Sequence, residues 1–238
     1  MELARWLVVV SLVLVCGCKK EPPRPSGRLP IHEAVSSGQL SRVRQLLATG
    51  AVNPDARDRY GWTPLHRAVD QGSATMVGLL LRYGADPDAQ GGPEGPPLHS
   101  AIIWGHRAVI HKLIAAGADV NLRNLSPDTF YPGMTPLQCV LEYTPSIWKD
   151  EMVRMLLAEG ANPDIPTDTG DTPLHRTARD GLLKVTKTFV MHGVNVNAQD
   201  AKGSAPLHCA AWGNHVETAV FLLDHGADID RADQVGDT

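Results

Sequence analysis

The chain has 238 residues, of which 43% are hydrophobic, and it carries a formal net charge of −4. This length and apolar content fit one domain with a continuous core. The mildly acidic balance, without a run of Lys or Arg, excludes the electrostatic footprint of a nucleic-acid-binding protein, so we expect no nucleic-acid partner.

The first residues form a segment unlike the rest of the chain. An apolar run of ten residues, broken only by Ser11, follows Arg5 and covers residues 6–15. That length is far short of the ~20 apolar residues that a membrane-spanning helix needs, but it matches the apolar core of a secretory signal peptide. We therefore expect residues 1–17 to be a signal peptide.

The residues after this run, Val15-Cys16-Gly17-Cys18-Lys19, resemble the lipobox of a bacterial lipoprotein. A small residue directly precedes Cys18, so the resemblance implies that Cys18 is the lipidated first residue of the mature chain. Cys16 is the weaker candidate, because the residue before it is bulky, and it is itself an uncommon occupant two places before the cleavage site. Under the sorting rule of enteric bacteria, Lys19 favours the outer over the inner membrane. Ordinary secretion and a misread start are the alternatives.

Residues 19–28 are rich in Pro and in charged residues, a composition typical of stiffened, solvated linkers. We expect residues 18–28 to tether a lipid anchor to the folded domain, or alternatively to be no more than a disordered end. The expected location is the bacterial cell envelope, with the protein facing the periplasm.

The rest of the chain repeats a four-residue signature whose clearest copy is Thr63-Pro64-Leu65-His66. Successive copies begin 34, 33, 39, 37 and 33 residues apart, at Leu29, Thr63, Pro96, Thr135, Thr172 and Ala205. A period in this range is the mark of a stacked repeat array.

The residues of one copy explain why it folds as a pair of short helices. Thr63 is a good N-cap, Pro64 suits the first helical position, and Gly72 stops the first helix after about two turns. Residues 76–81 form a second apolar stripe that ends before Gly84. Two helices this short cannot bury their apolar faces alone, so each pair must pack against its neighbours.

A helix–helix–turn unit that carries T-P-L-H-x-A resembles the ankyrin repeat. The match is carried by Thr63–Ala68, by Thr172–Ala178 and by the Gly-Ala-Asp tails at Gly84, Gly117 and Gly226. The resemblance covers residues 29–238 and implies an all-α solenoid with short β-turn fingers. Its six repeats would be 29–62, 63–95, 96–134, 135–171, 172–204 and 205–237.

The two ends of this array differ. The polar outer helix of the first repeat suits an N-terminal cap. At the other end, Gly236-Asp237-Thr238 matches Gly170-Asp171-Thr172, so Thr238 stands where a further repeat would begin. We expect either that the sequence is truncated there or that the sixth repeat exposes an apolar face that needs a partner.

The histidines of the signature recur once per repeat, at His66, His99, His175 and His208. They would lie about one helix diameter, ~10 Å, apart, whereas zinc ligands must converge within ~2.1 Å of one point. We expect them to bridge backbone groups of adjacent turns, with Gln138 doing so in the fourth repeat. The sequence therefore predicts no metal site.

The sequence also predicts no disulfide, no calcium site and no catalytic motif. Cys139 and Cys209 lie two repeats apart, roughly 20 Å, beyond the ~7 Å limit between the Cα atoms of a disulfide. Carboxylate pairs such as Asp86 and Asp88 lie in turns and lack the six or more oxygens of a calcium site. No metalloprotease, nucleophile-elbow or P-loop motif occurs. We expect no enzyme, no cofactor and no small-molecule substrate.

Aromatic residues at positions that packing does not require are the candidate protein-binding residues. In ankyrin-like folds the fingers and the end of the first helix contact partners, and exposed Trp and Tyr anchor interfaces. The candidates are Tyr60 and Trp62 in a finger, Ile103 and Trp104 at a helix end, Phe130 and Tyr131 in the third repeat's six extra residues, and Tyr143 and Trp148 in a fourth-repeat loop lengthened by four. Alternatively, these rings pack together or support the insertions. The expected polar rim is Asp58, Arg59, Asp70, Gln71, Asp168, Asp171, Arg179, Asp180 and Lys202.

These features predict a protein–protein interaction module, namely a membrane-tethered ankyrin-repeat lipoprotein that binds an envelope protein through its fingers and concave face. One alternative is an inhibitor, stabiliser or immunity protein for a periplasmic enzyme or toxin. Another is a cytoplasmic or secreted ankyrin effector.

Overall fold

The computed structural model describes residues 30–50, 52–92, 95–126, 132–236 and 238. All regular secondary structure within these ranges is α-helical, in twelve helices and without a strand. The predicted all-α class is therefore confirmed. Across the described residues, every helix is too short or too polar to cross a membrane.

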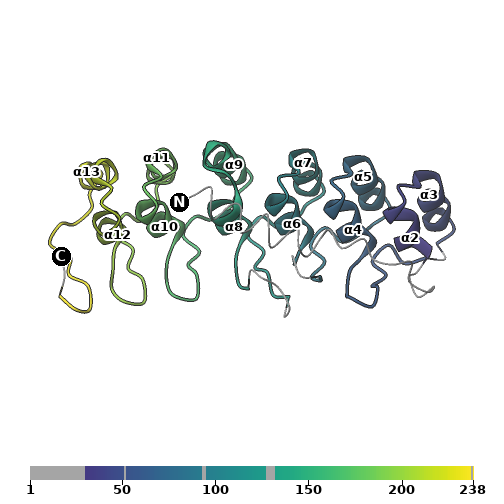
Figure 1. Cartoon of the computed structure of the whole chain (residues 1–238), viewed down its shortest axis with the longest axis horizontal. Helices are drawn as coiled ribbons and strands as arrows, with labels where there is room; N and C mark the ends of the chain where they lie inside the picture. The colour runs from purple at the N-terminus through teal and green to yellow at the C-terminus, as the bar shows by residue number, and fades with distance from the viewer. Residues whose placement is uncertain (1–29, 51, 93–94, 127–131, 237) are drawn as a thin grey trace. The chain divides into compact units, whose positions relative to one another are not determined.

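The chain divides into two compact units. The first comprises Met1–Ala118 with Leu125–Phe130. Its helices are α2 (Pro30–Ser36), α3 (Leu40–Ala48), α4 (Pro64–Asp70), α5 (Ala74–Arg82), α6 (Pro97–Ile103) and α7 (Arg107–Ala115). Figure 1 shows α2, α4 and α6 in an inner row and α3, α5 and α7 in an outer row, with loops that extend from the inner row away from the outer one.

The second unit comprises Asp119–Asn124 with Tyr131–Thr238. Its helices are α8 (Pro136–Tyr143), α9 (Ser146–Ala158), α10 (Pro173–Arg179), α11 (Leu183–Met191), α12 (Pro206–Trp212) and α13 (Val216–Asp224). Within this unit they form an inner row of α8, α10 and α12 and an outer row of α9, α11 and α13 (Figure 1).

The inner helices begin where the signature predicts, and in α4 and α10 a threonine and a histidine cap each other. At α4, Thr63 Oγ1 accepts a hydrogen bond from the backbone N–H of His66 at 3.4 Å, and His66 Nδ1 accepts from the backbone N–H of Thr63 at 3.2 Å. Pro64 follows at the first helical position, where a missing N–H leaves no bond unmade. The helix gives way at Gly72, whose φ of +64° suits glycine.

The core of each unit lies between its rows of helices. In the first unit, Leu65 and Val69 of α4 and Val77 and Leu80 of α5 are fully buried. Burying such a side chain contributes about 1.5–3 kcal/mol. Because α4 also packs against α6, and α5 against α7, the stacking of neighbouring pairs adds to this stabilisation.

The fourth repeat corrects one prediction. Its four extra residues do not lengthen a loop; they lengthen α9, which has 13 residues where α11 and α13 have nine. Tyr143 is the last residue of α8 and Trp148 lies in the first turn of α9, with Thr144 and Pro145 between the helices. The reason is local, since Pro145 occupies the N-cap and residues 146–158 contain neither Gly nor Pro to break the helix.

Asp150 anchors this longer helix to its neighbour. Its buried carboxylate accepts a hydrogen bond from Thr188 Oγ1 at 2.8 Å, and Lys184 Nζ lies 3.1 Å away, both on α11. Burial alone would raise the pKa of Asp150, but hydrogen bonds from Thr188, Lys184 and Arg154 hold it below its usual value. The carboxylate therefore stays ionised and joins the two outer helices.

Candidate protein-binding surface

Side chains at the last position of the signature connect several of the inner helices to the next finger. His175 Nε2 lies 2.9 Å from the carbonyl oxygen of Ser204, and Gln138 Nε2 donates to the carbonyl oxygen of Ile165 at the same distance. His32 reaches the carbonyl oxygen of Trp62 at 2.8 Å. These contacts confirm the predicted structural role of the signature. Within the described ranges, no three His, Cys, Asp or Glu side chains gather as metal ligands.

The two cysteines of the second unit are packing residues. Cys139 and Cys209 are fully buried and unpaired. Burial raises the pKa of both thiols, so each stays protonated at neutral pH. Neither presents the accessible thiolate that nucleophilic chemistry requires.

Trp62 is held in place by its surroundings. The Arg67 guanidinium lies 4.0 Å from the centroid of the indole, and Arg67 also pairs with Asp58 at 2.9 Å. On another side the ring fills the space beside Gly92, where an added Cβ would lie 2.5 Å from Trp62 Nε1. The half-buried Trp62 therefore joins two consecutive fingers, a role that the prediction of a binding residue did not include.

Asp58 shapes the turn that precedes Trp62. Its Oδ1 accepts from the backbone N–H groups of Tyr60 at 2.8 Å and of Trp62 at 3.1 Å. Burial tends to raise the pKa of this carboxyl, but the Arg67 side chain and these two N–H groups lower it overall. With 4% of its side chain exposed, Asp58 is a structural residue, so its assignment to the polar rim was wrong.

Tyr60 is the exposed aromatic of this finger. Its side chain is 48% exposed, and the Arg59 guanidinium lies 4.8 Å from the ring centroid. Because Asp58 and Trp62 fix the backbone on either side, the phenol is presented to solvent from a rigid turn. This arrangement is typical of an interface anchor.

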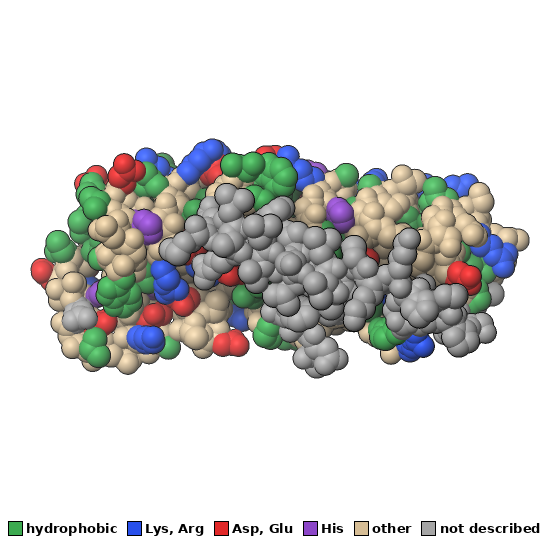
Figure 2. All heavy atoms as spheres, in the orientation of Figure 1, with side chains coloured by type: hydrophobic (Ala, Val, Ile, Leu, Met, Phe, Trp, Pro, Cys, Tyr) green, Lys and Arg blue, Asp and Glu red, His purple; other side chains and the backbone are tan. Residues whose placement is uncertain are grey.

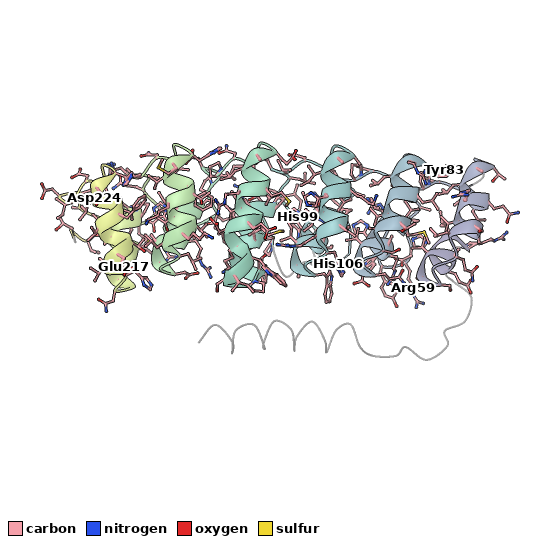
Figure 3. The ribbon with its side chains drawn as sticks, turned by 90° about the horizontal axis from the view of Figure 1, so that it is seen from above. Arg59, Tyr83, His99, His106, Glu217 and Asp224 are labelled. Atoms are coloured by element: carbon pink, nitrogen blue, oxygen red, sulfur yellow. The ribbon has the colours of Figure 1, made fainter. Side chains whose placement is uncertain are left out.

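Ile103 and Trp104, both half-buried, stand at the end of α6. The nearby His106 ring covers Gly72, and its Nε2 lies 3.4 Å from the carbonyl oxygen of Asp70, which fixes this turn against the preceding repeat. In Figure 3, Arg59 and His106 lie along the same edge of the first unit, and Tyr83 lies at the opposite edge. We call the edge with Arg59 and His106 the open edge. We assign to it these two residues and their neighbours in the chain, Tyr60, Ile103 and Trp104.

The open edge is defined without the other predicted residues. Phe130 and Tyr131 lie outside the described residues. Tyr143 and Trp148 belong to the second unit, where Tyr143 is half-buried and Trp148 is 43% exposed. Ile147, which was not among the predicted residues, is 81% exposed beside Trp148. In the sequence, the adjacent apolar residues Ile147 and Trp148 were the signal that could have indicated this exposed site.

Several expected rim residues of the second unit are engaged with one another. Asp171 accepts a hydrogen bond from Arg179 at 2.8 Å, and Asp180 accepts one from Arg176 at 2.7 Å. Burial alone would lower the pKa of both arginines, but their carboxylate partners raise it, so the guanidinium groups remain charged. These pairs support the helix ends.

A second apolar surface covers the last pair of helices. Val216, Val220 and Leu223 of α13 are 66%, 49% and 37% exposed, and Trp212 at the end of α12 is 56% exposed. Their spacing of four and then three places the α13 side chains on one stripe. Hydrophobic side chains are visible over this end in Figure 2. The helical spacing of these residues could be recognised in the sequence. Only the structure shows that no other described residue covers the stripe.

Two protein-family models match this chain. A family model described as ankyrin repeats (three copies) matches residues 4–91 and 146–233, and a single ankyrin-repeat model matches residues 96–125. The two models together match most of the chain.

Several curated proteins are similar over part of their length. Mouse 2-5A-dependent ribonuclease is 51% identical over 55 residues, which are 23% of this chain and 8% of that protein. The 26S proteasome non-ATPase regulatory subunit 10 of Dictyostelium discoideum is 35% identical over 85 residues, 36% of this chain and 37% of that protein. The mouse B-cell lymphoma 3 protein homolog is 29% identical over 179 residues, 73% of this chain and 38% of that protein. The chain spans less than half the length of these eukaryotic relatives.

Two solved structures of ankyrin repeat domains have a similar fold. The crystal structure of the ankyrin repeat domain of Bcl-3 has a TM-score of 0.77 and 29% identity, over 89% of this chain and 92% of that one. The human ASB11 ankyrin repeat domain has a TM-score of 0.67 and 26% identity, over 89% and 90% of the two chains.

Proposed function

Because this chain belongs to the ankyrin-repeat family, a family of protein-interaction modules, we propose that it binds a partner protein of the bacterial envelope at its open edge while a lipid at Cys18 holds it to the membrane. The observation that carries the binding proposal is the contrast within one finger. Trp62 is fixed by Arg67 and Gly92, whereas Tyr60, two residues before it, is 48% exposed.

A rigid, exposed anchor favours binding because little conformational freedom is lost when the partner docks. Ordering a loop at an interface costs free energy, and the hydrogen bond from the Tyr60 backbone N–H to Asp58 already fixes the backbone of this turn. Arg59, stacked on the same ring, adds a charged group at the rim that tunes the association rate.

The helix end provides the second half of the surface. Trp104 contributes aromatic area, and its indole Nε1 is buried without a hydrogen-bond partner among the described residues. An unsatisfied buried donor costs about 1–3 kcal/mol. Because this N–H is buried, a partner reaches only the outer part of the indole, which contributes apolar area rather than a hydrogen bond.

Capture from envelope extract tests this surface. Tyr60→Ala combined with Ile103→Ser removes two anchors of the open edge, and Met191→Ala, on the 75% exposed Met191 of α11, is the matched control. We expect the parent and the control to retain one envelope protein that the double variant loses, with all three unfolding at similar urea concentrations. Retention of the same proteins by the double variant would contradict the assignment.

The lipid anchor is supported by the apolar run at residues 6–15 and by the lipobox-like segment that ends at Cys18. Metabolic labelling with palmitate tests it. The parent should carry label, Cys18→Ala should lose it, and Cys16→Ala should keep it. An unlabelled parent would contradict the anchor while leaving the binding surface intact, and sedimentation of the labelled protein with outer-membrane fractions would test the favoured location.

A further inference from the structure

The outer helices of the first unit carry charge of one sign only. α3, α5 and α7 contain no Asp or Glu, although the whole chain has a net charge of −4. Their basic residues, all exposed, are Arg42, Arg44, Arg82, Arg107 and Lys112. Lys and Arg atoms are visible along the outer margin near α3 and α5 in Figure 2. We call these five side chains the basic face.

Two of these cations lie beside the same residue, Gly78. Arg82 Nε donates to the carbonyl oxygen of Gly78 at 3.3 Å. Lys112, from the neighbouring helix α7, lies over the same residue, since a Cβ added to Gly78 would be 3.4 Å from Lys112 Nζ. The basic residues of α5 and α7 therefore lie around one residue of α5, and neither helix supplies a carboxylate to offset their charge.

In the described part of the chain, four cations of the basic face lack a neighbouring carboxylate. Among the described residues, no carboxylate lies within 4.0 Å of the nitrogens of Arg42, Arg44, Arg82 or Lys112. Arg42 bonds only the neutral side chain of Gln45, at 2.8 Å. These four charges therefore remain available to an external anion.

The outer helices of the second unit differ. Lys149, Arg154, Lys184 and Lys187 are balanced there by Asp150, Glu151, Glu217 and Asp224, which makes four of each sign. Lys184 and Arg154 also pair with the buried Asp150. The excess of positive charge is confined to the first unit and is not a general property of outer helices in this chain.

We propose that the basic face lies against the anionic phospholipid headgroups of a bilayer. The inference rests on the proposed lipid anchor, because Cys18 precedes Pro30 by twelve residues (30 − 18), a reach of at most about 43 Å when fully extended. A field of dispersed cations without a pocket suits a diffuse anionic surface. Each cation near such a surface strengthens binding roughly fivefold.

This placement has a consequence for partner access. In the first unit the outer row lies opposite the loops that extend from the inner row (Figure 1). With α3, α5 and α7 on the headgroups, the finger that carries Tyr60 points away from the bilayer. The membrane would then orient the open edge toward proteins of the surrounding compartment.

Vesicle co-sedimentation of the full chain tests the proposal. All variants carry Cys18→Ala, so the result does not depend on lipidation. The probes are vesicles of phosphatidylcholine alone and vesicles in which one third is phosphatidylglycerol. Arg82→Glu with Lys112→Glu reverses two charges of the basic face, and Lys187→Glu with Lys202→Glu makes the same change in net charge elsewhere. Arg42→Gln with Arg44→Gln is a second, milder test on exposed positions.

We expect the parent to bind the anionic vesicles more than tenfold better than the neutral ones, and this preference to fall with added salt. Arg42→Gln with Arg44→Gln removes two face cations and should weaken that binding about 30-fold. The reversal at Arg82 and Lys112 also adds two anions, so it should weaken binding further, whereas the control pair should have less than a threefold effect. Equal binding to both vesicle types, or equal losses in the face and control variants, would overturn the proposal. Binding of poly-glutamate without binding of vesicles would also overturn it, in favour of an acidic protein. A failed palmitate label beside intact vesicle binding would instead refute only the anchor.

Discussion

Gln138 donates a 2.9 Å hydrogen bond from its side-chain amide to the carbonyl oxygen of Ile165, where the equivalent imidazole of His175 reaches Ser204. Its Oε1 also accepts from the backbone N–H of Thr135 at 2.9 Å, as His175 Nδ1 does from Thr172. A group that cannot titrate thus performs the structural work of the signature histidine.

This equivalence predicts how stability depends on pH. Burial, followed by the charge of Arg57, lowers the pKa of His66 from 6.5 to about 4. Between those values the unfolded chain binds a proton that the folded chain does not, so the free energy of unfolding falls as the pH drops from 6.5 to 4. The full effect is about 3 kcal/mol.

His66→Gln should keep the capping bonds and lose this part of the pH dependence. Gln138→His should gain a similar dependence, which makes it the reciprocal control. Urea unfolding at pH 7, 5.5 and 4 measures both. Parallel curves for the parent and His66→Gln would show that another group controls the acid limb.

A single-atom change should stabilise the first finger. Asp55 accepts from the backbone N–H of Asp86 at 2.9 Å. The equivalent Asn197 accepts in the same way and also donates to the carbonyl oxygen of Gly226 at 2.8 Å, a bond that a carboxylate cannot make. Asp55→Asn should therefore gain a bond to Gly84 and about 0.5–1.5 kcal/mol of stability. Asn197→Asp should lose a similar amount, and chemical denaturation measures both changes.

Two glycines with the same backbone conformation should respond differently to alanine. Gly38 and Gly72 have φ values of +66° and +64°, but an added Cβ at Gly38 meets nothing within 4 Å, whereas at Gly72 it meets the His106 ring at 2.8 Å. Gly38→Ala should cost about 1–2 kcal/mol from backbone strain alone. Gly72→Ala should cost about 1–3 kcal/mol more, because the ring must move.

The extra loss of stability in Gly72→Ala, which we attribute to the His106 ring, is testable. Adding His106→Ala to Gly72→Ala should recover much of the extra loss, while adding it to Gly38→Ala should recover none. Thermal unfolding of the four variants gives the comparison, and equal effects at the two glycines would contradict the contact with His106.

Neighbouring aromatics of one finger should separate stability from binding. Trp62→Ala removes the contacts with Arg67 and Gly92 and should destabilise the chain by about 2 kcal/mol or more. Tyr60→Ala should change stability by less than about 0.5 kcal/mol, as is usual for exposed positions. It should nevertheless weaken partner binding about 30-fold, as expected for an interface anchor. Comparable destabilisation by both variants would place Tyr60 in the core.

The repeat fold was predictable because its signals are local. Thr63, Pro64 and Gly72 each determine the backbone within a few residues, and their recurrence shows that neighbouring pairs stack. The extra turn of α9 was missed because insertion length alone does not distinguish a longer loop from a longer helix. The decisive feature was the absence of a breaker after Pro145.

The candidate site was less predictable, because exposure depends on distant residues. Trp62 and Tyr60 are two residues apart and equally aromatic, but Trp62 is fixed by Gly92, thirty residues further along. Asp58 resembles a surface carboxylate in sequence and is instead buried beneath Arg67. Only the folded arrangement separates these structural residues from those available to a partner.

Photo-crosslinking in living cells tests the central claim most directly. A benzoyl-phenylalanine incorporated in place of Tyr60 reaches only molecules that dock at the open edge, and the same probe in place of Met191, which is 75% exposed on α11, is the control. We predict an ultraviolet-dependent adduct between this chain and one envelope protein from position 60 and none from position 191. No adduct from position 60, or the same adducts from both positions, would contradict the assignment of the open edge as the protein-binding surface.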